Sequence, residues 1–223
     1  MKHDTLPAGL PPPAVSRETH ERLEIYAELL TRWQARINLI SPRDIPHLWP
    51  RHIDDALQLL PLIPSSTTRA IDLGSGAGLP GLILAIASGI SFDLVESDQR
   101  KAAFLREAIR ATSAPARVHP QRIETAALEP AALITARALA PLASLLDWAY
   151  PLLAPDGVCL FPKGRNVDLE LTAAASRWHM QLGRTPSRTD PSATILRISE
   201  VVPVPPSSRP AAFPPGSANG DAG

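Results

Sequence analysis

A glycine-rich segment, residues 70–82, has the residue types and spacing of a cofactor-binding loop. An apolar run leads into Gly74, Gly76 and Gly78, and a pattern typical of a helix follows. Glycines in such a turn let the backbone approach a ligand without a Cβ in the way. Glu96 ends the next apolar run 22 residues after Gly74, where an acidic side chain commonly binds ribose hydroxyls. The combination predicts a nucleotide-like cofactor site, and the alternative is a turn that needs glycines only for its own shape.

Two side chains near the loop bear on the charge of the cofactor. The spacing Gly76-x-Gly78-x-x-Gly81 also fits a dinucleotide fingerprint, which leaves a nicotinamide-dependent dehydrogenase open. The Asp72 carboxylate would repel a pyrophosphate but suits the amino group and sulfonium of S-adenosylmethionine. Pro80 removes a backbone N–H near the helix start, where a pyrophosphate needs donors. Both favour S-adenosylmethionine and hence methyl transfer, while Asp72 can also cap the loop, a compatible role.

The acceptor atom is constrained by what the sequence lacks. Methyl transfer to an exocyclic amine usually uses an Asn/Asp-Pro-Pro-aromatic motif after the fourth strand, but residues 134–141 contain none. The single cysteine, Cys159, falls within a predicted buried strand and is expected to be an inert core thiol. An acceptor with a free lone pair, such as guanine N7, needs neither a base nor a covalent step. Catalysis would then consist of alignment and electrostatics.

Charged side chains at the predicted carboxyl edge of the sheet are the candidates for substrate contact. Arg137 is the only charge in the apolar stretch 136–142, where it would contact phosphate or guanine, or pair with Glu96 or Glu124. Lys163 follows the fifth strand at the same edge and is either a substrate contact or a solvated loop charge. His52 opens a predicted helix, where it either faces the cofactor cleft or, together with Asp55, simply caps the helix and forms a pair.

The elements that position these residues follow from apolar spacing. Steps of three and four residues predict helices over 17–37 and 49–62. Beyond residue 66, short apolar runs alternate with helical patterns, which indicates a parallel sheet with helices on both faces. The strands are predicted at 70–73, 92–95, 117–119, 133–135, 157–161 and 194–198, and the helices at 80–88, 99–112, 141–153 and 166–179.

Composition predicts four regions of the chain. We expect a disordered N-terminus at 1–15, a helical cap at 16–66, an α/β nucleotide-fold domain at 67–201 and a disordered proline-rich tail at 202–223. No apolar run is long enough for a membrane span and no signal peptide follows Met1, so a cytoplasmic globular protein is expected.

Charge and cysteine content exclude several functions. Lys+Arg and Asp+Glu are both 22 among 223 residues, which excludes general electrostatic capture of nucleic acid. Two stretches are locally basic: 100–122 has six basic residues against one acidic residue, and 163–197 has six against three. They would suit an RNA backbone, although an arginine-rich composition explains them equally well. One cysteine excludes disulfide frameworks and multi-cysteine clusters, and the six histidines lack metal-ligand spacing.

Several stretches together resemble the bacterial 16S ribosomal RNA guanine-N7 methyltransferases, the glucose-inhibited division protein B family. The resemblance covers about residues 20–200 in one order, and the Gly-Leu-Pro-Gly ending of the loop and the Arg-His-Ile element are its most specific parts. The stretches are Leu29-Leu-Thr-Arg-Trp33, Ile37-Asn-Leu-Ile-Ser41, Arg51-His-Ile-Asp-Asp55, Asp72-Leu-Gly-Ser-Gly-Ala-Gly-Leu-Pro-Gly81, Glu96-Ser97, Lys101-Ala-Ala-Phe-Leu105, Arg122-Ile-Glu124, Arg137-Ala138 and Pro162-Lys-Gly164.

The resemblance implies a class I, Rossmann-like methyltransferase fold with a small N-terminal helical extension. It implies methylation of a guanine in a loop near the decoding region, with ribosomal RNA of the small subunit, free or in a particle, as the partner. A methyltransferase acting on a small molecule stays as the alternative, and a non-catalytic RNA-binding protein is a weaker one. Pro162 and the proline-rich tail depart from the usual family pattern. No metal is expected, and no protein partner is predicted.

The resemblance also implies roles for individual residues. Arg137 is expected where cofactor and target base meet and is the catalytic candidate. Substrate contact is assigned to Arg51, His52 and Lys163. The residues expected to bind S-adenosylmethionine are Asp72, Gly74, Gly76, Gly78, Leu79, Glu96, Ile123, Glu124 and Arg137.

Overall fold

The first element of the described residues is an amphipathic helix, as the apolar spacing predicts. The computed structural model describes residues 15–205; the N-terminal residues 1–14 and most of the tail expected to be disordered lie outside them. α1 (Arg17–Gln34) starts after Ser16, whose hydroxyl accepts a hydrogen bond from the Thr19 amide at 3.1 Å. Leu23, Tyr26 and Leu30 are its buried stripe.

The second predicted helix, 49–62, is instead a series of short turns. A 3-10 helix, η1 (Pro42–His47), precedes a π-helical turn, η2 (Trp49–Ile53), and one turn of α-helix, α2 (Asp54–Leu57). A 3-10 turn, η3 (Leu60–Leu62), ends the region. Pro61 lacks the amide donor that a continuous helix would need at its position, which explains the break before η3.

One seven-stranded sheet forms the centre of the molecule, in the order β3-β2-β1-β4-β5-β7-β6. β1 to β5 pair in parallel, whereas β7 is antiparallel to β5 and to β6. The strands are β1 (Arg69–Leu73), β2 (Ser91–Val95), β3 (Ala116–His119), β4 (Ala131–Thr135), β5 (Leu153–Lys163), β6 (Trp178–Pro186) and β7 (Thr194–Pro203).

The last two strands correct the expectation of a wholly parallel sheet. β6 is absent from the predicted strands, because only Trp178 along it is fully buried and its apolar signal is weak. The connection 187–193 is too short for the crossover that a parallel pair would need, so β6 and β7 form a hairpin. β7 continues to Pro203, two residues past the boundary expected for the tail, and Val204 is buried beyond it.

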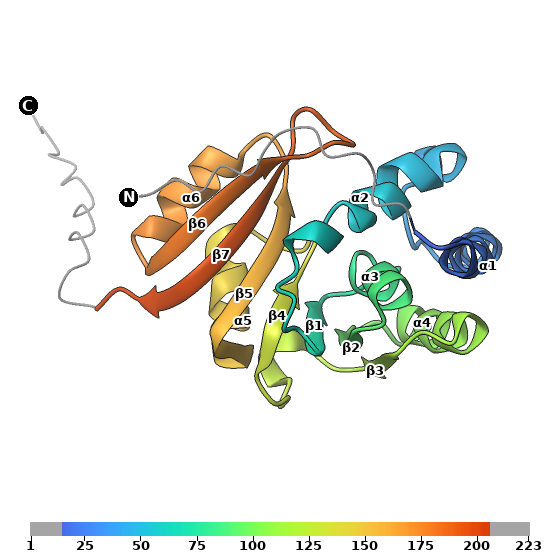
Figure 1. Cartoon of the computed structure of the whole chain (residues 1–223), viewed down its shortest axis with the longest axis horizontal. Helices are drawn as coiled ribbons and strands as arrows, with labels where there is room; N and C mark the ends of the chain where they lie inside the picture. Colours follow the sequence, from blue (N-terminus) through green and yellow to red (C-terminus); the bar gives the residue numbers. More distant parts are fainter. Residues whose placement is uncertain (1–14, 206–223) are drawn as a thin grey trace, which may run out of the picture.

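Helices cover both faces of the sheet (Figure 1). α1, α2, α3 (Gly81–Ser88) and α4 (Gln99–Thr112) pack on one face, and α5 (Leu142–Ala149) and α6 (Val167–Ala175) pack on the other. The helices predicted at 141–153 and 166–179 are shorter. A 3-10 turn, η5 (Tyr150–Leu152), follows α5, and β6 begins at Trp178, before the predicted end of α6. No helix in the stretch 15–205 is both long and apolar enough to cross a membrane.

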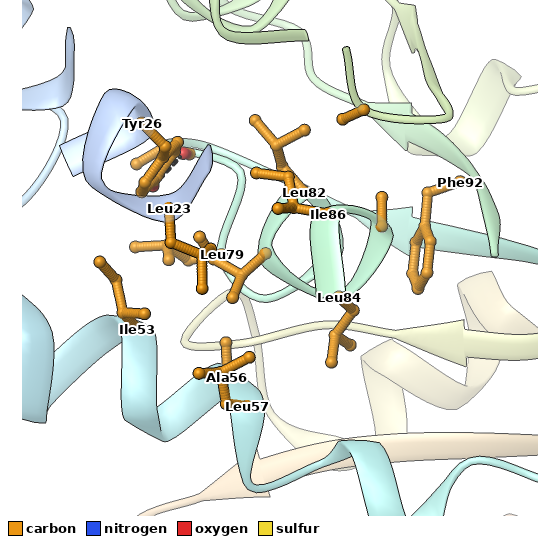
Figure 2. Packing of buried hydrophobic residues seen from close by; sticks show 14 of the residues in the cluster. Leu23, Tyr26, Ile53, Ala56, Leu57, Leu79, Leu82, Leu84, Ile86 and Phe92 are labelled. Carbon is orange, nitrogen blue, oxygen red and sulfur yellow. Dashed lines mark hydrogen bonds between the residues drawn. The ribbon is translucent and has the colours of Figure 1, made fainter. Parts of the chain in front are cut away.

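The N-terminal helices share a core with the sheet. Leu23 and Tyr26 of α1 pack around Leu79 and Leu82, at the start of α3 (Figure 2). The same cluster extends to Leu133 of β4. The region 16–66 is therefore built onto the sheet and has no separate core of its own.

Strand order and register bring the candidate residues to one edge. Leu73 of β1 lies beside Val95 of β2, and Asp72 lies beside Thr135 of β4. The chain leaves β1 toward β2 on one side and returns to β4 on the other, which makes the β1/β4 boundary the topological switch point. In open α/β sheets the ligand crevice lies at the carboxyl ends of the strands at this point.

Candidate functional site

A cavity of about 410 Å³ lies at this switch point. It is bounded by the glycine loop after β1, the end of β2, the segment after β3 and the segment after β4. The predicted cofactor residues that line it are Gly74, Gly76, Leu79, Glu96, Ile123, Glu124 and Arg137.

The loop owes its shape to glycine at two kinds of position. Gly74 and Gly76 have φ angles of 64° and 56°, in the left-handed region that L side chains rarely adopt. At Gly81, an added Cβ would lie 2.5 Å from the Cβ of Asp72, so α3 begins in direct contact with that side chain. Glycine at these places brings the loop backbone to the cavity wall and seats the helix behind it.

Glu96 organises the loop from the neighbouring strand. Its Oε2 accepts a hydrogen bond from the Gly76 amide at 2.8 Å, and its Oε1 accepts one from the Asp98 amide at 2.7 Å. Each carboxylate oxygen has a further lone pair, and the residue lines the cavity. Glu96 can therefore hold the loop and still accept hydrogen bonds from ribose hydroxyls.

Two predicted cofactor contacts lie away from the cavity. Asp72 is fully buried beneath the loop, where Thr135 donates a hydrogen bond to its carboxylate. Burial raises the pKa of Asp72 to about 6, against the opposing effect of that hydrogen bond. Gly78 is buried against Leu82 and Leu105. Neither residue lines the cavity, and both support the loop from beneath.

The opposite wall contains residues that the sequence did not single out for the site. Leu39 and Ile40 line the cavity and are held by Gln34, whose Oε1 accepts hydrogen bonds from both of their amides at 2.9 and 3.0 Å. Trp148 of α5 also lines the cavity. The sequence held one signal that could have pointed to Leu39 and Ile40. Gln34, a polar residue, ends the amphipathic helix five residues before this apolar pair.

α1 also holds the glycine loop directly. The hydroxyl of Tyr26 donates a hydrogen bond to the Ala77 carbonyl at 2.7 Å, and Tyr26 is completely buried. Burial raises the pKa of the Tyr26 phenol well above its ordinary range. The phenol is therefore a neutral structural donor that fixes the loop to the N-terminal helix.

A second cavity of about 1080 Å³ adjoins the first, and Arg137, Ala138 and Leu139 line both. Its walls come from the η2–α2 region, the segment after β4, the start of α6 and the β6–β7 connection. All three predicted substrate contacts, Arg51, His52 and Lys163, line it.

Arg137 lies at the boundary of the two cavities and is held by the N-terminal region. Its Nη1 donates to Asp55 Oδ2 at 2.9 Å, and the two side chains are mostly buried. Its Nη2 lies 2.8 Å from Nδ1 of His52. The expected pairing with Glu96 or Glu124 is replaced by these partners, which lie more than 80 residues earlier in the chain.

His52 has one arrangement of its ring nitrogens that fits its neighbours. Arg137 is only a donor, so Nδ1 of His52 accepts and Nε2 carries the proton that it donates to Asp44 at 3.1 Å. Burial and the adjacent Arg137 charge lower the pKa of His52, against the effect of Asp44 and Asp55. The imidazole is therefore neutral near pH 7 and engaged at both nitrogens.

Lys163 is similarly engaged within the protein. The residue is only 8% exposed, and its Nζ donates to the Ala140 carbonyl and to Glu170 Oε2, both at 2.7 Å. The same Glu170 oxygen accepts a hydrogen bond from the Leu142 amide at 2.8 Å. Lys163 thus ties α6 to the segment that connects Arg137 with α5. This structural role differs from both roles considered from the sequence, a substrate contact and a solvated loop charge.

Other reactive groups in the described residues stay outside this chemistry. Cys159 is fully buried in β5, and burial raises the pKa of its thiol far above the ordinary range, as expected for an inert core residue. Across residues 15–205 no cluster of three or more His, Cys, Asp or Glu side chains could hold a metal ion.

Comparison with known proteins identifies close relatives. A family model described as "GidB: rRNA small subunit methyltransferase G" matches residues 19–190. Ribosomal RNA small subunit methyltransferase G of Gluconobacter oxydans is 60% identical over 186 residues, which cover 83% of this chain and 96% of the relative. The protein of the same name from Granulibacter bethesdensis is 56% identical over 196 residues, 88% of this chain and 91% of the relative.

Solved structures show the same fold at low identity. The TYW2 protein of M. jannaschii in complex with AdoMet has a TM-score of 0.56 and 13% identity, covering 76% of this chain and 80% of that one. An O-methyltransferase from Bacillus cereus in complex with SAH has a TM-score of 0.52 and 15% identity, covering 84% and 93%. The fold is therefore the Rossmann-like methyltransferase fold, with α1 as the N-terminal extension.

Proposed function

The chain belongs to the GidB family, rRNA small subunit methyltransferase G, and on this premise we propose that it methylates N7 of a guanine in a decoding-region loop of 16S ribosomal RNA. The methyl donor is S-adenosylmethionine. The observation that carries the proposal is the meeting of two cavities at Arg137. The smaller has the loop and carboxylate of a cofactor site, and the larger is open enough for a nucleotide.

The residues of the smaller cavity fit S-adenosylmethionine. Gly74 and Gly76 allow the loop backbone to approach the ligand, and Glu96 retains lone pairs for the ribose hydroxyls. Ile123 and Glu124 line the cavity where the adenine would lie, and Leu79 lines it from the loop. When bound, S-adenosylmethionine supplies an electrophilic methyl group. The chain has then to hold the acceptor in line with it and to exclude water.

Guanine N7 suits the side chains of the larger cavity. Its lone pair can attack a methyl group without losing a proton, so no general base is required. His52, the most obvious candidate base there, uses both ring nitrogens for Arg137 and Asp44. Arg137 is a donor placed at the boundary of the cavities, where it can orient the base by hydrogen bonding. The cavity thus favours alignment over proton transfer.

Basic side chains at the rim of the larger cavity suit the RNA backbone. Arg51 lines the cavity with an exposed side chain, and Arg165 is exposed beside it. Both lie close enough to Asp190 to help lower the pKa of that residue, after the larger effect of hydrogen bonds from Ser192. Such positions would attract phosphate by charge. A ribosomal substrate also means that the protein acts in the cytoplasm.

Methyl transfer to defined RNA tests this proposal. The purified protein is supplied with isotopically labelled S-adenosylmethionine and with undermethylated small ribosomal subunits or protein-free 16S RNA. Cleavage chemistry that reports N7-methylguanine then maps the product. Label at one loop guanine is expected, and the better acceptor identifies the assembly state of the substrate. Cofactor binding without label in either RNA would overturn the ribosomal proposal and favour a small-molecule acceptor.

A further inference from the structure

Asp55 connects Arg137 to a distant part of the fold. Its Oδ2 accepts a hydrogen bond from Arg137 at 2.9 Å, and its Oδ1 accepts one from the Thr189 hydroxyl at 2.6 Å. Thr189 belongs to the β6–β7 connection, which forms part of the wall of the larger cavity. One mostly buried carboxylate therefore joins the residue at the cavity boundary to this part of the wall.

Gln58 strengthens the same bridge one helical turn later. Its Nε2 donates to Asp55 Oδ1 at 2.8 Å and lies 3.2 Å from the Ser187 hydroxyl, while its Oε1 accepts from the Arg188 amide at 2.9 Å. Gln58 is only 5% exposed, so these bonds face little competition from water. The β6–β7 connection is thus held against the α2 region by Asp55 and by both the nitrogen and the oxygen of the Gln58 side-chain amide.

Charge gives Asp55 a second effect on methyl transfer. Methylation at N7 makes the guanine cationic, as the positive sulfonium becomes a neutral thioether. An unpaired guanidinium beside the base would oppose that charge. The Asp55 carboxylate, 2.9 Å from Arg137, offsets its charge and leaves its remaining N–H groups as hydrogen-bond donors.

We propose that Asp55 is a positioning residue for methyl transfer, which holds Arg137 at the boundary of the cavities and couples it to the β6–β7 connection. The inference rests on the proposed function for its catalytic effect. Its structural part, coupling between residues 137–141 and 187–193 through Asp55, is independent of the acceptor.

The first test compares Asp55→Asn with a matched control, Asp156→Asn. Asp156 is an exposed carboxylate of β5 that lines neither cavity. Asp55→Asn is expected to lower kcat for transfer to 16S RNA by roughly tenfold or more, since small displacements of aligned groups have such effects. Affinity for S-adenosylmethionine should change less than about twofold, because Asp55 lies outside the smaller cavity. A kcat equal to that of Asp156→Asn would overturn the inference.

A milder pair of variants tests the second arm of the bridge. Thr189→Ser keeps the hydroxyl and is expected to retain activity, whereas Thr189→Val removes it and should lower kcat. Because Val and Thr are similar in size, a loss in Thr189→Val alone points to the hydroxyl, which bonds to Asp55, Gln58 and Ser187. Equal activity in the two variants would contradict the coupling.

A double-mutant cycle separates positioning from general structural damage. If Asp55 acts through Arg137, Asp55→Asn should lower kcat much less in an Arg137→Ala background than in the wild type. Equal losses in the two backgrounds would show that Asp55 acts elsewhere.

Amide hydrogen exchange measures the coupling between residues 137–141 and 187–193 without any substrate. Asp55→Asn should accelerate exchange in both 137–141 and 187–193, two segments separated in sequence, while the control Asp156→Asn leaves them unchanged. Faster exchange confined to residues around position 55 would overturn the inference. A wild-type protein that methylates no ribosomal RNA would overturn only the proposed function, because the exchange experiment still decides the coupling.

Discussion

Arg137 shows how a single side chain can serve two cavities. It lines both, yet its guanidinium is held on the side of Asp55 and His52, which leaves its other donors for a ligand. A residue so engaged orients groups and cannot act as a base, since arginine stays protonated in proteins.

Removing this guanidinium should strongly reduce methyl transfer. Arg137→Ala is expected to lower kcat for 16S RNA by roughly 100-fold, in the range seen when one preorganised donor is lost. Filter binding of labelled product measures the rate, and circular dichroism checks the fold. Full activity in a folded variant would remove Arg137 from the site.

Asp72 should make stability depend on pH in an unusual direction. Its pKa is raised from 3.8 to about 6 by burial, so the folded state keeps a proton that the unfolded state releases. The free energy of unfolding contributed by this group is therefore greatest below pH 4 and falls as pH rises to 6. A shift of about two pKa units corresponds to about 3 kcal/mol.

Urea unfolding of the wild type and Asp72→Asn isolates that contribution. Asparagine does not titrate, so the stability of the wild type minus that of the variant should fall by about 2–2.5 kcal/mol between pH 4 and pH 7. Any constant effect of the substitution cancels in this comparison. A difference that is independent of pH would show that Asp72 titrates normally in the folded protein.

At the scale of elements, Lys163 and Glu170 determine where the segment after β4 lies. Lys163 ends β5, Glu170 is on α6, and together they bond to Ala140 and Leu142. Lys163→Met should therefore lower stability by about 1–3 kcal/mol, because it removes the cation from the Glu170 carboxylate and the donor from the Ala140 carbonyl. Methyl transfer should fall as well.

The two readouts distinguish the possible roles of Lys163. Thermal unfolding and the rate of labelled methyl transfer are measured on the same variant. A loss of activity with unchanged stability would instead support the direct substrate contact expected from the sequence.

Local signals explain which elements were predictable. The glycine loop, β1 to β5 and α4 each carry their pattern within about fifteen residues, and all were found at nearly the observed positions. β6 was missed because its partly exposed residues give weak alternation. Asp55 was noted only as a partner for His52, since its bonds to Arg137 and Thr189 span 82 and 134 residues and exist only once the chain has folded.

At the scale of the whole molecule, the N-terminal region and the sheet form one structure. Leu23 of α1, Ile53 of η2 and Leu133 of β4 belong to the same buried cluster, and all three are completely buried. The cofactor loop lies between α1 and the sheet and is bonded to both, through Tyr26 and Glu96. The site therefore depends on the helical region as much as on the nucleotide fold.

A core substitution in α1 should consequently weaken the entire protein and not only its N-terminus. Leu23→Ala is expected to lower the free energy of unfolding by about 2–5 kcal/mol, as for other fully buried leucines. Because the cluster is continuous, unfolding should remain one cooperative transition.

Circular dichroism reports the helices and strands, and tryptophan fluorescence reports both faces of the sheet, since Trp33 and Trp178 pack against different clusters. Coincident midpoints by both probes are expected, at a lower denaturant concentration than in the wild type. An early fluorescence change that precedes loss of the sheet would mean that residues 16–66 unfold as a separate unit, and the cofactor loop would then lose its support from Tyr26 while the sheet persisted.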